Sequence, residues 1–179
     1  MRFLTVMKKI ITIVCALLCV SLLLGACSKS EDGAPDGMKQ ASSDNVDYIM
    51  YVPENWKVDK SELYTSAFYS SADATSISAV ANGVAADETV KTWWDSFYEK
   101  FTSVYSDCGE PESTDVTLGG TDGEKYTFSG TLNGQEYKYI IAACVRGGYV
   151  YYLTYTSTPD YYENHLDEFD KTVENFSFR

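Results

Sequence analysis

Along most of the chain, apolar and polar residues alternate in short runs bounded by turn residues, which is the pattern of β-strands. Such runs occur at residues 47–52, 63–70, 75–81, 113–118, 124–132, 135–145 and 149–157. Asn133-Gly134 is typical of a type I′ hairpin turn, and Arg146-Gly147-Gly148 provides the next turn. We therefore predict an antiparallel meander over residues 124–157.

Two other stretches repeat apolar residues every three or four positions and predict helices. The first begins near Asp87 as N-cap and ends by Cys108, and its stripe is Val90, Trp94, Phe97, Phe101 and Val104. The second begins with Thr158 as cap and Pro159 in the first turn, and its stripe is Tyr162, Leu166, Phe169 and Val173. Residues 175–179 form a possible short edge strand.

The last strands of the meander carry apolar residues on both faces, with Ile141 and Val145 on one side and Ile140 and Cys144 on the other. Strands of this kind need cover on both faces of their sheet. The predicted fold is therefore α+β, with an antiparallel sheet of about six to seven strands flanked by two helices in an α/β/α sandwich.

The beginning of the chain predicts an exported lipoprotein. Arg2, Lys8 and Lys9 precede an uncharged apolar run over residues 10–24, which is shorter than the roughly 20 residues that a membrane span needs. Leu24-Gly25-Ala26-Cys27 then resembles the lipobox of bacterial lipoproteins, in which the cysteine is acylated and the peptide is cut before it. We expect a signal peptide over residues 1–26 and a lipid anchor on Cys27, at the extracytoplasmic face of a bacterial cell membrane. The alternatives are a plain signal peptide with a chance cysteine, or an uncleaved anchor helix.

After the leader, residues 27–45 are small, polar and without periodicity, so they predict a flexible tether, followed by one domain over residues 46–179. The 11 basic and 26 acidic residues beyond residue 26 give a net charge of −15. This charge argues against nucleic acid and anionic lipid surfaces as partners. It fits a soluble exported protein, or one that meets cationic partners or metal ions.

No residue set in the sequence predicts a catalytic, metal or cofactor site. His165 is the single histidine, and without a matching Ser or Cys motif we expect a partly exposed helix residue rather than a base or metal ligand. Cys108 and Cys144 are expected to be free thiols, and nothing near Cys108 indicates an activated nucleophile. The glycine-rich residues 119–123 join two strands, so they form a turn rather than a phosphate-binding loop.

Tyrosine is abundant, and a few tyrosines are candidates for ligand binding. Tyr149, Tyr151 and Tyr155 share one face of a predicted strand, and Trp93 is a further candidate on the first helix. Exposed aromatic rings bind sugars and peptides, although most of these rings are expected in the core under the helices.

Three stretches resemble the PsbP-like and Mog1-like family. They are Val52-Pro53-Glu54-Asn55-Trp56, the strand at residues 148–156, and residues 169–178. The resemblance implies an antiparallel sheet with helices on both faces and, more loosely, a binding or assembly function. Known members include an extrinsic photosystem subunit and a Ran-binding protein, but neither partner transfers to this chain.

These observations favour a lipid-anchored, non-catalytic binding or assembly module of the bacterial envelope, with an envelope protein or a glycan as partner. The alternative is a carbohydrate-binding or small-ligand-binding lipoprotein that uses exposed Tyr and Trp. An envelope hydrolase ranks last, since it would have to depend on His165 or Cys108.

Overall fold

The computed structural model describes residues 33–59 and 65–179. The predicted signal peptide and Cys27 lie outside these residues. Of the segment Met1–Asp36 only residues 33–36 are described, and Gly37–Arg179 forms one compact unit. None of the helices within the described ranges is long and apolar enough to span a membrane.

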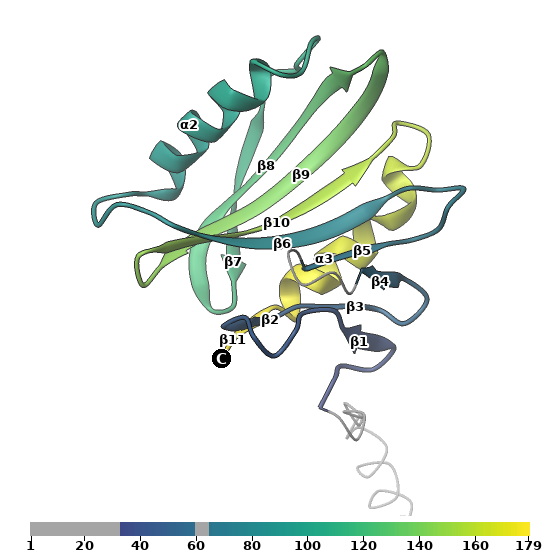
Figure 1. The fold of residues 1–179 in the computed structure, drawn as a ribbon, viewed down its shortest axis with the longest axis vertical. Coiled ribbons are helices and arrows are strands. Elements are labelled where there is room, and N and C mark those ends of the chain that lie inside the picture. The colour runs from purple at the N-terminus through teal and green to yellow at the C-terminus, as the bar shows by residue number, and fades with distance from the viewer. Residues whose placement is uncertain (1–32, 60–64) are drawn as a thin grey trace, which may run out of the picture. The chain divides into compact units, whose positions relative to one another are not determined.

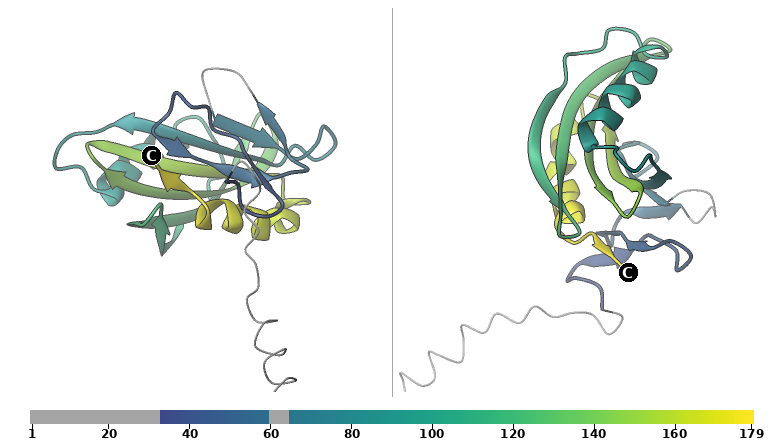
Figure 2. Two further views of the ribbon diagram at one scale, coloured as in Figure 1. Left: turned by 90° about the horizontal axis from the view of Figure 1, so that it is seen from below. Right: turned by 90° about the vertical axis from the view of Figure 1, so that its left-hand side faces the viewer.

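A seven-stranded antiparallel sheet lies at the centre of this unit (Figure 1). The strand order is β4-β5-β6-β10-β9-β8-β7. The strands are β4 (Lys57–Asp59), β5 (Thr65–Phe68), β6 (Ser76–Gly83), β7 (Glu112–Leu118), β8 (Thr121–Leu132), β9 (Gln135–Arg146) and β10 (Tyr149–Ser157). The longest strands curve strongly along their length (Figure 2). The predicted meander is confirmed as β8-β9-β10.

Two-residue turns connect the strands of the meander. Asn133 and Gly134 have φ angles of 52° and 81°, as a type I′ turn requires. Gly119 and Gly120 make a similar turn before β8, so the glycine-rich stretch is a turn followed by strand. A Cβ atom on Gly119 would lie 2.7 Å from the ring of Phe178, which explains why no side chain fits there.

Two small antiparallel pairs complete the β-structure. β1 (Met38–Gln40) pairs with β3 (Tyr51–Pro53), and β2 (Tyr48–Ile49) pairs with β11 (Ser177–Phe178). The predicted boundary of the tether at residue 45 is therefore wrong, because residues 38–45 belong to the folded unit. The backbone N–H of Ala41 donates to the carbonyl of Met50 (2.8 Å). A polar segment without periodicity can be ordered in this way, since its backbone hydrogen bonds come from a distant strand.

The helices begin later than the sequence predicts. α2 (Val90–Thr102) is capped by Thr89 rather than Asp87, and Thr89 and Thr92 exchange hydrogen bonds in a capping box. The second helix is a 3₁₀ turn, η1 (Tyr162–His165), followed by α3 (Leu166–Glu174). The hydroxyl of Tyr155 donates to the carbonyl of Tyr162 (2.7 Å) and so ties the 3₁₀ turn to β10.

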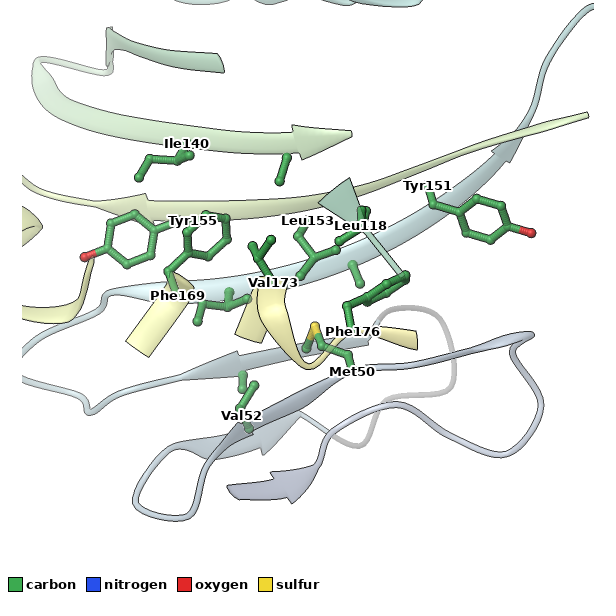
Figure 3. Packing of buried hydrophobic residues seen from close by; sticks show 14 of the residues in the cluster. Met50, Val52, Leu118, Ile140, Tyr151, Leu153, Tyr155, Phe169, Val173 and Phe176 are labelled. Atoms are coloured by element: carbon green, nitrogen blue, oxygen red, sulfur yellow. The ribbon is translucent and has the colours of Figure 1, made fainter. Parts of the chain in front are cut away.

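The core has two layers, one on each face of the sheet, which confirms the predicted sandwich. Between the sheet and α3, Tyr155, Phe169 and Met50 are fully buried (Figure 3). Between the sheet and α2, the ring of Trp94 lies parallel to that of Tyr126, with centroids 3.8 Å apart.

Replacement of Trp94 by Ala is expected to lower the free energy of unfolding by about 3–5 kcal/mol, because it leaves a cavity against Tyr126. Trp93, its half-buried neighbour, is the matched control, and Trp93→Ala is expected to cost roughly 1–2 kcal/mol. Urea denaturation followed by circular dichroism measures both. Equal losses would contradict this account of the α2 layer.

Candidate binding pocket and a buried histidine

A pocket of about 790 Å³ lies between residues 40–48 and one end of the sheet. Residues 43–47 lie between β1 and β2, at the tip of the hairpin that β1 forms with β3, and we call them the hairpin tip. The opposite wall comes from β4 and β6, with the small side chains of Ala79 and Ala81 on β6. The polar lining includes Gln40, Asn45, Asp47, Asp59, Thr65 and Asn82.

Arg179 holds the hairpin tip in place. Its backbone N–H donates to the carbonyl of Asp47 (2.9 Å), and its guanidinium donates to the carbonyls of Ser43 (2.9 Å) and Val46 (2.5 Å). The guanidinium also lies 3.2 Å from a carboxylate oxygen of Asp44. The wall of the pocket is thus fixed by a residue far away in the sequence.

Tyr48 ties the same segment to the sheet. Its buried hydroxyl donates to the side chain of Thr65 (2.9 Å) and approaches the carbonyl of Ala79 (3.1 Å). Burial raises the pKa of Tyr48, so the hydroxyl keeps its proton and acts as a donor. The ring stacks on Phe176, with centroids 5.4 Å apart.

Two of the candidate tyrosines lie at this pocket. Tyr149 lines it and is 48% exposed. Tyr151 lies behind the pocket, and its hydroxyl donates to the carboxylate of Asp47 (2.5 Å). Burial raises the pKa of Tyr151 to about 12, and the bond to Asp47 adds to this effect. Figure 3 shows the Tyr151 hydroxyl pointing away from the packed core side chains.

The other two candidates lie elsewhere. Tyr155 is 0% exposed, so its assignment as a ligand-binding residue is wrong, because core packing covers the whole side chain. Trp93 belongs to the α2 layer on the opposite face of the sheet, where it packs against Tyr152 and Phe97. The four candidates therefore form no single site. The sequence could not indicate the pocket, because residues 40–45 resembled a tether.

His165 is buried in η1, so the expectation of a partly exposed helix residue is wrong. Its Nε2 lies 2.9 Å from a carboxylate oxygen of Asp73, and its Nδ1 lies 2.5 Å from a carboxylate oxygen of Glu168. The indole N–H of Trp56 donates to the same oxygen of Glu168 (3.0 Å). Each ring nitrogen thus lies within hydrogen-bond distance of a carboxylate. Neither ring nitrogen is left for a substrate or a metal.

Asp73 is the most deeply buried carboxylate of this histidine cluster, which consists of Asp73, His165 and Glu168. Burial opposes its ionisation, but hydrogen bonds from the side chain and backbone of Thr75, and then from His165, lower the pKa of Asp73 overall. Asp73 lies 92 positions from His165, so no local pattern in the sequence could reveal the pair.

Cys108 and Cys144 are both free thiols, as expected. Burial raises the pKa of Cys144 to about 11, and burial followed by the charge of Asp107 raises the pKa of Cys108. Both are therefore protonated at neutral pH and are poor nucleophiles. Within residues 33–59 and 65–179, no group of three or more His, Cys, Asp or Glu side chains is arranged to hold a metal ion.

The sheet order, the two helical layers and the pocket together define an α+β domain with the PsbP/Mog1-like fold. The cyanobacterial PsbP (CyanoP) of Synechocystis superposes with a TM-score of 0.57 and 13% identity, covering 87% of this chain and 99% of that chain. The Ran-binding protein Mog1p of Saccharomyces cerevisiae gives 0.58 and 12%, covering 79% and 95%.

A third solved structure is LpqN of Mycobacterium tuberculosis, described as involved in cell envelope biogenesis. It gives a TM-score of 0.55 and 16% identity, covering 73% of this chain and 82% of that chain. No family model matches the chain, and no curated protein matches its sequence. At these identities the likeness establishes the fold.

The lowered pKa of Asp73 predicts a loss of stability in acid. The carboxyl binds its proton at lower pH in the folded chain than in the unfolded chain, so Asp73 stabilises the fold above the ordinary value of 3.8. This stabilisation is lost as the pH falls through the lowered folded-state value.

Urea midpoints measured between about pH 5 and pH 2 test this effect. Asp73→Asn should be less stable than the natural protein at neutral pH, and it should lose less stability over that interval. Replacement of the exposed carboxylate of Asp167 by Asn is the control and should keep the natural pH profile. Identical profiles for Asp73→Asn and the natural protein would contradict the assignment.

Proposed function

We propose that this protein is a non-catalytic binding module, anchored to the outer face of a bacterial membrane by lipid on Cys27, and that the pocket beside the hairpin tip receives its ligand. The observation that carries the proposal is the pocket itself, a hollow of about 790 Å³ with polar walls. Small-molecule sites commonly have volumes of about 300–1,000 Å³.

The chemistry of the reactive side chains supports binding rather than catalysis. A general base needs a ring nitrogen that can reach a substrate, and both nitrogens of His165 face carboxylates inside the core. A thiol nucleophile needs a lowered pKa, and those of Cys108 and Cys144 are raised. An assignment as a binding module requires neither group.

The named structural relatives are consistent with this class. Mog1p is described as a Ran-binding protein and LpqN as a protein involved in cell envelope biogenesis. The lipobox at residues 24–27 favours an envelope role for this chain as well. The proposal also allows a protein partner, provided that the partner inserts a group into the pocket.

The anchor is tested by Cys27→Ser in the full chain. We expect the natural protein to carry two acyl chains on Cys27. It should therefore fractionate with membranes, because two chains give stable attachment where one is marginal. The variant should move to the soluble or unprocessed fraction. Intact-mass analysis of the natural protein is the decisive readout, and an unmodified leader would contradict the proposal.

The pocket is tested by filling it. Ala81 is half-buried and lines the pocket, so Ala81→Trp should occupy the space of a ligand. Ala86→Trp, at an exposed position outside the pocket, is the matched control. Full-length protein purified from its own membranes should release a small molecule, detected by mass spectrometry, from the natural chain and Ala86→Trp but not from Ala81→Trp. The same compounds from all three would contradict a pocket site.

A further inference from the structure

We infer that the pocket binds a neutral saccharide, with Tyr149 as the aromatic platform and Asp47 as the principal hydrogen-bond acceptor. This inference rests on the proposed function, because it names the ligand class for the same pocket. Four properties of the described lining lead to it: charge, hydrogen-bonding capacity, the position of the exposed ring, and size.

Charge disfavours anionic ligands. The carboxylate of Asp47 lines the pocket, and the described residues of the lining include no Lys, Arg or His. The guanidinium of Arg179 points into the back of the hairpin tip, where it is occupied by the carbonyls of Ser43 and Val46. A phosphate or carboxylate ligand would therefore meet the negative charge of Asp47.

Hydrogen-bonding capacity favours hydroxyl groups over a cation. The lining combines the carboxylate of Asp47 with the amide groups of Asn45 and Gln40, which both donate and accept, and the Gln40 amide already donates to the carbonyl of Ser42 (2.8 Å). A sugar hydroxyl also donates and accepts, so it can use both kinds of group. An ammonium ion can use only the acceptor atoms of these groups, whereas a hydroxyl group uses their donors as well.

The exposed ring is placed beside the strongest acceptor. Tyr149 and Tyr151 are two residues apart on β10, and their ring centroids lie 6.2 Å apart. Tyr151 donates its hydroxyl to Asp47 and so holds that carboxylate on the same side of the pocket as the Tyr149 ring. The apolar C–H face of a sugar can lie on the ring while its edge hydroxyls donate to the carboxylate.

Size admits more than one sugar ring. The wall on β6 includes the small side chains of Ala79 and Ala81, and the volume of about 790 Å³ exceeds what one hexose fills. The hairpin tip is already fixed by Arg179 and Tyr48, so binding requires little ordering of the wall. The geometry suits a short oligosaccharide.

The test uses the full chain in a polyoxyethylene detergent, because sugar-based detergents would compete. Saturation-transfer NMR is recorded with N-acetylglucosamine, its β-1,4-linked tetramer, mannose and maltotriose. We expect at least one saccharide to bind, with Tyr149→Ala weakening it about tenfold or more, which corresponds to about 1.4 kcal/mol. Tyr161→Ala is the control, since Tyr161 is exposed to a similar degree (38%) and lies outside the pocket.

Spermidine and inorganic phosphate are the opposing probes. Binding of either one that Ala81→Trp abolishes, with no saccharide bound, would overturn the saccharide assignment and leave the proposed pocket function standing. Equal weakening of saccharide binding by Tyr149→Ala and Tyr161→Ala would also overturn it. A saccharide that still binds Ala81→Trp as tightly would place the sugar elsewhere and overturn both proposals.

Discussion

The architecture depends on the pairing of β2 with β11, which joins the beginning and the end of the folded unit. Phe178 lies opposite Tyr48 in this pair, and Arg146 lies 4.3 Å from the centre of the Phe178 ring. These contacts connect the hairpin at residues 38–53 to the end of the long strand β9. They add to the burial of Met50 and Val52 in holding the hairpin on the sheet, since isolated two-stranded hairpins are marginally stable in water.

The same pairing explains how a pocket can exist at the edge of a core. Met50 and Val52 are fully buried and pack into the layer that contains α3, so one strand of the hairpin is part of the core. The residues just before it, 40–48, wall the pocket and are held by Tyr48 and Arg179. The hairpin is therefore packed into the core through Met50 and Val52, and its residues 40–48 border the pocket. A wall fixed in this way is prepared for binding at low entropic cost.

Much of the sheet could be predicted from the sequence because strand alternation and two-residue turns are local signals. The meander at residues 124–157 and the sandwich class were readable from such local patterns, as was the apolar stripe of α2 from Val90 to Phe101. The predicted end of that stripe is wrong, because α2 ends at Thr102 and Val104 is exposed. The predictions failed where order comes from distant partners. β1 is ordered by β3, and the carboxylate of Asp73 accepts its bond from His165 across the fold. The candidate tyrosines on β10 share one strand face, yet the exposed fraction of the side chain falls from 48% at Tyr149 to 0% at Tyr155. The packing of α3 causes this difference, and no local pattern in the sequence reveals it.

The earlier start of the folded unit also changes what an anchored pocket could reach. From Cys27 to Gln40 the chain has 13 residues, which span at most about 45 Å when fully extended. With lipid on Cys27, the pocket wall that begins at Gln40 would thus stay within a few nanometres of the membrane. The net charge of −15 beyond residue 26 would keep the domain from lying on an anionic bilayer. In that arrangement, the short connection and the charge would favour ligands that project from the surface of the membrane or cell wall over ligands embedded in the lipid.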